Sequence, residues 1–294
     1  MGPTSRPRGG TRRRAGGREL AGRARRPSKA SLTGGSGPRW KRRGGQNSLQ
    51  ARMTDFVKHF ADAFTAKQIA SRSMSLRAQG LITPAARPDG CAVRFDRIDG
   101  KSGLCLSRID PIRWLRPLSA LHRCTLPGLC RLDPQLRIRP RLHHLTSQDI
   151  AEALHALGRL PTKGNALLHG DMHLGQMIDA SDGTVWLIDL DDLCLGPAEA
   201  DLGNLIANLA TQAQLGDSFA KRLAFWRREV EAAWAKLVEP VCPDILERYI
   251  ALALIRRHLK FREAGRPDYE AEIVAWINPV AARISPSGSA GYPG

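Results

Sequence analysis

Acidic and amide side chains gather in one short stretch near the middle of the chain. Asp171 and Gln176 are followed at close spacing by Asp189 and Asp191. Carboxylate and amide oxygens are the hard ligands that Mg²⁺ prefers, and a separate carboxylate can accept a proton from a hydroxyl group. Phosphoryl transfer requires both, because the metal neutralises the phosphates while a carboxylate orients the attacking hydroxyl. The stretch therefore predicts phosphoryl-transfer chemistry.

These residues need a local structure that brings them together. The pattern predicts a strand at Met177-Ile178, a turn at Asp182-Gly183 and a second strand over Thr184–Leu190. Antiparallel pairing of residue 179 with residue 184 brings the two ends of this segment side by side. We therefore expect the four acidic and amide side chains to converge at one edge of a hairpin.

The order of these residues resembles a known motif. His169-Gly170-Asp171, Gln176 and Ile188-Asp189 resemble the catalytic loop and metal-binding segment of the aminoglycoside phosphotransferase/choline kinase family. The resemblance is strongest over about residues 165–205 and extends more weakly over about 44–285. It implies an α+β, two-lobed, protein-kinase-like fold with a small N-lobe sheet and a mainly helical C-lobe.

The resemblance implies a role for each matching residue. Asp171 corresponds to the catalytic base, and Lys58 to the lysine that binds the α- and β-phosphates. Gln176 and Asp189 correspond to the Mg²⁺ ligands, and Asp191 is an additional candidate ligand. The implied cofactors are ATP, with GTP as the alternative donor, and Mg²⁺. The implied reaction transfers the γ-phosphoryl group to a hydroxyl of a small molecule.

Supporting roles fall on four further residues. His169 braces the catalytic loop, and Asp201 ties the following helix to that loop. Asn47 belongs to a segment that resembles a reduced phosphate-covering loop. Gln68 stands where the family has a glutamate beside the lysine, because the chain has no acid between Asp62 and Asp89.

Three departures from the family pattern keep an inactive protein as an alternative. Gln176 replaces the usual asparagine, although its carbonyl can still bind Mg²⁺. The missing glutamate leaves Lys58 with a neutral partner, and the N-lobe before Lys58 is short. A pseudokinase that binds nucleotide without turnover is therefore the second hypothesis.

The chain divides by composition into a basic tail (1–46), a reduced N-lobe (47–100), a helical C-lobe (101–285) and a frayed end (286–294). Residues 1–50 hold 14 Lys and Arg and one acid, whereas the rest of the chain holds 31 basic and 27 acidic residues. The tail admits three interpretations: a nucleic-acid or membrane-surface arm, a transit peptide, or an idle extension. The nearly neutral remainder and its few aromatic residues argue against nucleic acid as the main partner.

No apolar run is long enough to span a membrane, and the six scattered cysteines indicate buried thiols in a reducing compartment. We therefore expect a cytoplasmic protein; the sequence leaves its oligomeric state open. Residues 203–294 hold 10 acidic and 12 basic residues, which favours a sugar, amino alcohol or other metabolite over a polycationic aminoglycoside as acceptor.

Periodicity also predicts the other elements. Strands are expected over 55–60 and 91–96, with a helix over 66–79 whose apolar face includes Ile69, Met74 and Leu76. Glycines at 100 and 103 indicate a hinge, and a Pro-rich loop covers 127–140. Arg256-Arg257 is interpreted as a solvated face. Further helices are expected from Pro111 onward and over 147–160, 203–214, 218–237, 244–263 and 268–283.

Overall fold

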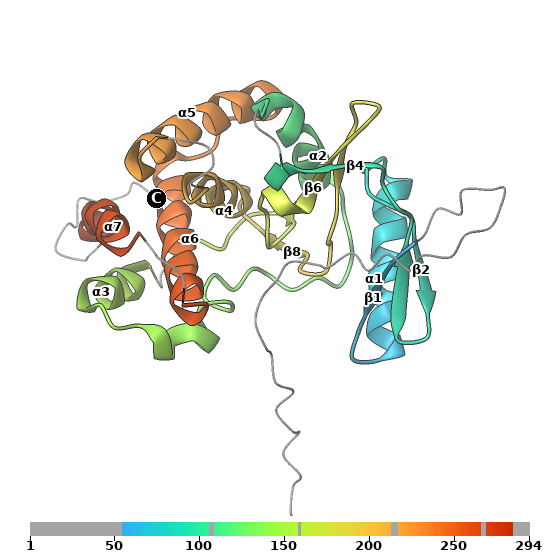
Figure 1. The fold of residues 1–294 in the computed structure, drawn as a ribbon, viewed down its shortest axis with the longest axis horizontal. Coiled ribbons are helices and arrows are strands. Elements are labelled where there is room, and N and C mark those ends of the chain that lie inside the picture. Colours follow the sequence, from blue (N-terminus) through green and yellow to red (C-terminus); the bar gives the residue numbers. More distant parts are fainter. Residues whose placement is uncertain (1–54, 106–108, 158–159, 213–216, 266–268, 285–294) are drawn as a thin grey trace, which may run out of the picture. The chain divides into compact units, whose positions relative to one another are not determined.

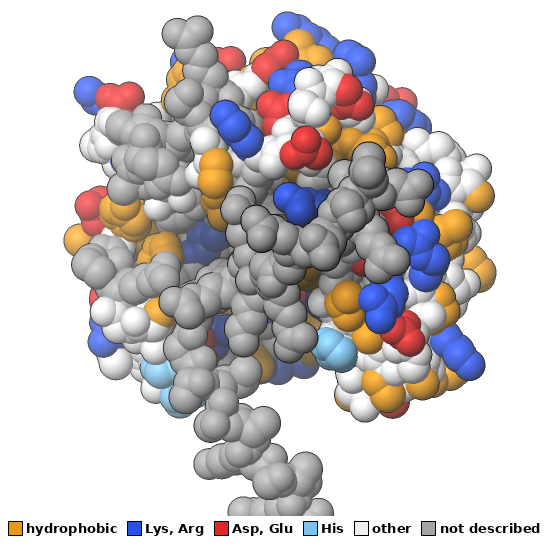
Figure 2. Space-filling model, turned by 45° about the vertical axis from the view of Figure 1, so that its right-hand side comes forward, with side chains coloured by type: hydrophobic (Ala, Val, Ile, Leu, Met, Phe, Trp, Pro, Cys, Tyr) orange, Lys and Arg blue, Asp and Glu red, His pale blue; other side chains and the backbone are white. Residues whose placement is uncertain are grey.

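The computed structural model describes residues 55–105, 109–157, 160–212, 217–265 and 269–284 (Figure 1). The basic tail and Asn47 lie outside these residues. Within the described part of the chain, no helix is both long enough and apolar enough to cross a membrane. On the face drawn in Figure 2, basic and acidic side chains are interspersed, in keeping with the nearly balanced charge of residues 51–294.

An antiparallel sheet and one helix form the N-terminal part of the described chain. The strand order is β1-β3-β2, with β1 at Phe56–His59, β2 at Ala86–Asp89 and β3 at Ala92–Phe95. Helix α1 (Ala63–Ala78) packs its Ile69 side against the buried Val93 of this sheet. Hydrogen bonds therefore hold β1 to β3, and β3 packs on α1 through a small apolar core.

Three details of this region differ from the sequence expectation. Helix α1 begins three residues earlier than expected, because Asp62 caps it and accepts a hydrogen bond from Thr65 N at 2.7 Å. Met74 is exposed rather than part of the apolar face. Strand β2 was not predicted, because its Arg87-Pro88 sequence is typical of a turn.

The expected hinge at Gly100 is a strand. Strand β4 (Gly100–Ser102) pairs with β6 (Met177–Ala180), which pairs in turn with β7 (Val185–Leu187). A Cβ atom at Gly100 would lie 2.5 Å from the carbonyl oxygen of Asp179. The glycine is therefore required for close approach of two strands, and the hinge prediction is wrong.

Helices dominate the rest of the described chain. They are α2 (Pro111–Arg123), α3 (Gln148–Leu157), α4 (Glu199–Ala210), α5 (Phe219–Leu237), α6 (Pro243–Glu263) and α7 (Glu270–Ile284). Helix α4 is almost entirely buried and packs against both α5 and α6, as Figure 1 shows. Gly203 permits this packing, because a Cβ atom there would lie 2.8 Å from the backbone of Tyr249.

Helix α2 begins at Pro111 as expected and contains Pro117. Asp110 caps it, with Asp110 Oδ1 3.1 Å from Ile112 N. Two other expectations need correction. Helix α4 begins at Glu199 rather than at residue 203, so Asp201 lies in its first turn. The segment expected as a loop over 127–140 ends in a 3₁₀ helix, η2 (Arg139–His144).

Short elements surround the stretch that carries the acidic residues. Strand β5 (Ala166–Leu168) pairs antiparallel with β8 (Cys194–Gly196), and a 3₁₀ turn, η3 (Leu174–Gln176), leads into β6. The sequence did not predict the β5–β8 pair. Because β5 precedes the catalytic-loop motif and β8 follows the second acidic segment, this pairing brings the two ends of the motif together.

The cysteine prediction is wrong for most positions. All six are free thiols, but only Cys124 is buried and Cys194 is half-buried. The exposed thiols are Cys91, Cys105, Cys130 and Cys242. Cysteine spacing in the sequence carries no information about which strand ends and loops reach the surface, so burial could not be inferred from it.

Candidate active site

Four of the predicted site residues form a cluster, here called the lysine–carboxylate cluster: Lys58, Gln176, Asp189 and Asp191. Lys58 extends from β1, and its Nζ lies 2.5 Å from Asp189 Oδ1 and forms an ion pair with Asp191. Gln176, at the end of η3, donates from Nε2 to Asp189 Oδ2 at 3.1 Å. The structure therefore brings together residues from β1, η3 and the segment that follows β7.

The backbone around Asp189 explains this convergence. Strands β6 and β7 pair residue 179 with residue 185, one position away from the expected register, and β7 ends at Leu187 rather than Leu190. Ile188 N donates to Gln176 O at 2.9 Å, and His169 Nε2 lies 2.9 Å from Ile188 O. Asp189 then has a left-handed backbone conformation with φ of 63°. Such a conformation is rare for a residue with a Cβ atom, and it turns the chain sharply at this carboxylate.

The two carboxylates of this cluster differ in their electrostatic state. Burial raises the pKa of Asp189, but the Lys58 ammonium outweighs it and holds the pKa below its usual value. Burial raises the pKa of Asp191, and the neighbouring Asp189 and Asp192 contribute to the rise. Asp191 Oδ1 is buried and has no hydrogen-bond partner. The single positive charge of Lys58 therefore does not balance the negative charges of Asp189 and Asp191.

This donor set fits a magnesium ion that also binds phosphate. Mg²⁺ commonly takes one or two protein carboxylates and completes its coordination with water and substrate phosphates. Asp189 and Asp191 supply the carboxylates and Gln176 supplies an amide, and the Oδ1 of Asp191, which has no hydrogen-bond partner, is available as a ligand. Among the described residues, no group of three or more His, Cys, Asp or Glu is arranged to hold a metal ion. A metal here would therefore depend on the phosphates for much of its coordination.

Asp171 lies in a second cluster, the arginine–aspartate cluster, formed with Arg137, Asn204 and Arg256. Arg137 Nη1 lies 2.6 Å from Asp171 Oδ2, and Arg256 Nη2 lies 2.7 Å from Asp171 Oδ1. Asn204 Nδ2 lies 3.4 Å from Asp171 Oδ1. Burial raises the pKa of Asp171, but the two guanidinium groups, Arg256 more than Arg137, hold it well below its usual range. Asp171 is therefore a firmly ionised carboxylate held between two cations.

Asp201 organises the backbone of the catalytic loop. Its Oδ2 accepts a hydrogen bond from His169 N at 2.7 Å, and its Oδ1 accepts one from Gly170 N at 3.0 Å. His122 Nε2 lies 2.9 Å from the same Oδ2. His169 and Asp201 are both buried. A buried carboxylate that accepts several hydrogen bonds fixes the loop that precedes Asp171.

Two of the predicted supporting residues do not join these clusters. Gln68 is exposed on α1, whereas the partners of Lys58 are Asp189 and Asp191. Asn47 lies outside the described residues. His173, in the loop between Asp171 and η3, caps η3 by accepting a hydrogen bond from Gly175 N at 3.0 Å. Burial lowers its pKa to about 4, so its imidazole is neutral at pH 7.

Sequence reasoning missed the partners of Asp171. Arg256 was interpreted as part of a solvated face, yet its side chain is only 19% exposed and pairs with Asp171. A signal was present, because Arg256 directly follows a run of buried residues from Tyr249 to Ile255 on α6. Arg137 lies in an irregular segment, and no local pattern marks it as a site residue.

The fold and the site together define a small-molecule phosphotransferase. Residues 94–239 match the model of the phosphotransferase enzyme family. This match confirms the resemblance inferred from the catalytic-loop motif. No curated protein is similar enough in sequence to match the chain.

Solved structures share the fold at low sequence identity. Amicoumacin kinase hAmiN, solved with AMP-PNP, Ca²⁺ and Ami, is 12% identical with a TM-score of 0.51, covering 78% of this chain and 82% of its own. An aminoglycoside phosphotransferase from Streptomyces rimosus is 16% identical with a TM-score of 0.51, covering 70% and 87%. Choline kinase LicA from Streptococcus pneumoniae is 14% identical with a TM-score of 0.50, covering 82% and 90%. These likenesses confirm the α+β, kinase-like fold class.

Proposed function

We propose that this protein transfers the γ-phosphoryl group of ATP to a hydroxyl of a small metabolite such as a sugar or amino alcohol. The observation that carries the proposal is the convergence of Lys58, Gln176, Asp189 and Asp191 from separate elements. Such a group of one cation and several oxygen ligands suits a metal-bound polyphosphate. The nucleotide would bind between the small N-lobe, over 47–100, and the helical C-lobe, over 101–285.

Each residue of the lysine–carboxylate cluster has a definite task in this proposal. Asp189 and Asp191 would hold Mg²⁺, with the Gln176 amide as a further ligand. The bound metal neutralises charge on the β- and γ-phosphates. Lys58 would move from the carboxylates to the α- and β-phosphates, because the metal replaces its ammonium as their counter-charge. Binding of ATP and Mg²⁺ would therefore replace the existing ion pairs of Lys58 with Asp189 and Asp191. The carboxylates would pair with Mg²⁺, and Lys58 would pair with the phosphates.

Asp171 would orient the acceptor hydroxyl and receive its proton. The transition state of phosphoryl transfer is loose, so positioning of the nucleophile matters more than the strength of the base. A carboxylate whose pKa lies well below its usual range still accepts a hydrogen bond from the hydroxyl. His169 and Asp201 would keep the loop in place and would not contact the substrate.

The experiment that tests the function measures ADP release by the full chain with Mg²⁺ and ATP against pooled hydroxylated metabolites and aminoglycosides. Asp171→Ala and Asp189→Ala are the test variants. The matched control is Asp182→Asn in the exposed β6–β7 turn. Acceptor-dependent ADP release that both test variants lose and the control keeps supports a kinase. Repeating the assay with GTP decides the donor.

A pseudokinase is the second candidate. It is favoured by the exposure of Gln68 and by the engagement of Lys58 with Asp189 and Asp191, since no described acid from α1 orients the lysine. This candidate predicts Mg²⁺-dependent ATP binding with no ADP release for any acceptor. Equilibrium titration with a non-hydrolysable ATP analogue distinguishes it from a protein that binds no nucleotide.

A further inference from the structure

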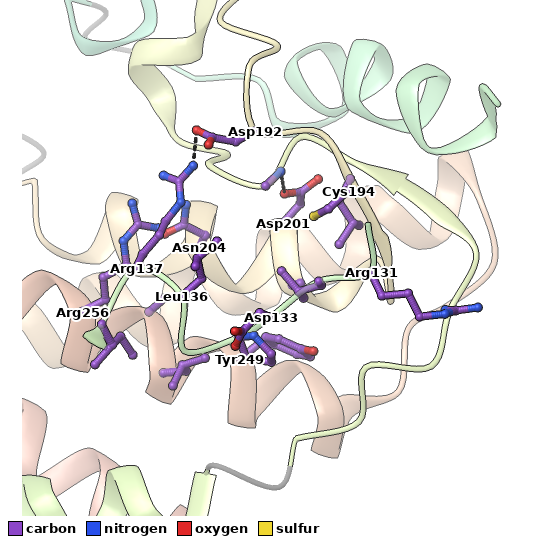
Figure 3. Close-up of a pocket in the computed structure, with 18 of the residues that line it drawn as sticks. Arg131, Asp133, Leu136, Arg137, Asp192, Cys194, Asp201, Asn204, Tyr249 and Arg256 are labelled. Carbon is purple, nitrogen blue, oxygen red and sulfur yellow. Dashed lines mark hydrogen bonds and ion pairs between the residues drawn. The ribbon is translucent and has the colours of Figure 1, made fainter. Parts of the chain in front are cut away.

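A cavity lies beside the arginine–aspartate cluster. Its volume is about 370 Å³, and it is bounded by the 130–138 segment, β8, α4 and α6 (Figure 3). Three of its lining side chains, from Arg137, Asn204 and Arg256, are the partners of Asp171. Its other walls include apolar residues such as Leu136 and Leu252. The cavity has the size of a small metabolite and a polar end built around the candidate base.

The carboxylate of Asp171 lies among several cationic side chains. Arg137 pairs with both Asp171 and Asp192, and Figure 3 shows it reaching toward Asp192. Arg256 pairs with the other oxygen of Asp171. Arg257 on the same helix donates to Asn204 O at 3.2 Å, and burial together with Arg256 lowers its pKa. Arg137 and Arg256 line the cavity, whereas Arg257 contacts Asn204 and does not. The other carboxylates in the lining have partners of their own: Asp192 pairs with Arg137, Asp133 with Arg139, and Asp201 accepts from the N–H groups of His169 and Gly170. An anion in the cavity could therefore take the place of Asp171 beside Arg137 and Arg256.

We propose that the phosphoryl acceptor carries a carboxylate or phosphate group, which binds Arg137 and Arg256 in this cavity and frees Asp171 for the acceptor hydroxyl. This proposal rests on the proposed function. A planar guanidinium binds carboxylate and phosphate oxygens with two parallel hydrogen bonds. If Arg137 and Arg256 release Asp171, they lose charge-assisted hydrogen bonds. A neutral hydroxyl cannot compensate this loss, whereas an anionic group can.

The transfer step balances with these groups in place. The acceptor oxygen forms a bond to the γ-phosphorus while the bond from that phosphorus to the ADP oxygen breaks. The hydroxyl proton passes to Asp171, which is free because the acceptor anion has taken its guanidinium partners. Arg137 and Arg256 are thus specificity-determining residues. A cationic acceptor would offer Arg137 and Arg256 no anion to replace Asp171.

The test compares acceptors that differ mainly in charge. D-Gluconate is paired with D-glucose, glycerol 3-phosphate is paired with glycerol, and kanamycin serves as the polycation. For each compound, kcat/KM for ADP release and equilibrium binding by calorimetry are measured on the full chain. The variants are Arg137→Gln and Arg256→Gln. The controls are Arg228→Gln and Arg262→Gln, whose guanidinium groups pair away from the cavity with Glu229 at 2.9 Å and Glu270 at 3.1 Å.

The expected result is a preference for at least one anionic acceptor over its neutral partner, reduced about tenfold or more by each test variant and unchanged by both controls. If the arginines have only a structural role, the variants will lower kcat/KM equally for both acceptors of a pair, and this result would overturn the proposal. Equal or better use of the neutral or cationic compounds would also overturn it, as would the absence of anion binding. If no compound is phosphorylated but arginine-dependent anion binding persists, the proposed function fails while the anion site stands.

Discussion

The two clusters of the site carry opposite charge imbalances. In the lysine–carboxylate cluster, one ammonium serves two carboxylates, and Asp191 Oδ1 is left without a partner. In the arginine–aspartate cluster, two guanidinium groups hold Asp171. The first cluster would be completed by a divalent cation, and the second by an anion. Under the proposed function, this contrast in charge distinguishes the metal–nucleotide side of the site from the acceptor side.

The two clusters lie on neighbouring backbone segments that touch each other at Gly170 and Asp192. Gly170 has φ of 78°, and a Cβ atom there would clash with Asp192 O. The catalytic loop therefore passes directly against the segment that carries Asp189 and Asp191. Close contact of the two chain segments explains how Arg137 reaches both Asp171 and Asp192.

The largest effect is expected from removing one carboxylate of each cluster. Asp171→Ala lowers kcat by about 10²–10⁴-fold, because the acceptor hydroxyl loses its hydrogen-bond acceptor, and leaves the Mg²⁺ requirement unchanged. Asp189→Ala lowers kcat and also raises the Mg²⁺ concentration at half-maximal rate. Magnesium titrations of ADP release check both statements. An equal shift of the Mg²⁺ requirement in the two variants would show that the clusters do not have separate tasks.

The contact between the clusters can be broken at Gly170. Gly170→Ala combines an unfavourable φ with a clash against Asp192 O, and we expect a loss of stability of about 2–4 kcal/mol. Gly183→Ala is the matched control, because its φ is 84° but nothing lies within 4 Å of the added Cβ. The control should cost only about 1 kcal/mol. Denaturant unfolding measures both, and equal losses would mean that the close contact contributes nothing.

Removing the charge of Asp201 should loosen the loop that leads to Asp171. Asp201→Asn keeps one oxygen, whereas His169 N, Gly170 N and His122 all approach the carboxylate. We expect a loss of about 1–3 kcal/mol, since a buried N–H is left unsatisfied. Thermal unfolding measures it, with Asp182→Asn as the exposed control. An unchanged melting temperature contradicts the bracing role.

The smallest effect is a pH dependence of stability that belongs to the arginine–aspartate cluster. The folded-state pKa of Asp171 lies below its unfolded value, so its ion pairs stabilise the fold above about pH 4 and lose this contribution as the pH falls further. The stability difference between wild type and Asp171→Asn should therefore shrink between pH 7 and pH 3. Denaturant unfolding at both values measures it. A difference that stays constant would mean that the guanidinium groups do not stabilise the carboxylate.

Local patterns predicted much of the fold. The 3.6-residue period and the capping residues located α5 and α6 closely, with Ser218 accepting from Lys221 N at 3.4 Å at the start of α5. Pro111 marked the start of α2 in the same way. The glycine pattern led to a wrong prediction at Gly100. Glycine is typical both of a hinge and of a place where two strands approach closely, and here it is the second.

The sequence by itself determined the family resemblance and the order of the acidic residues, and the predicted convergence holds for Gln176, Asp189 and Asp191. Short spacing around one hairpin limits where these three side chains can go, whereas Asp171, predicted to join them, lies in the arginine–aspartate cluster. Only the tertiary structure decided that Asp171 pairs with Arg137 and Arg256 while Lys58 pairs with the other carboxylates. Those pairings join segments distant in sequence, and they depend on how α6, η2 and β1 pack, which no local pattern encodes.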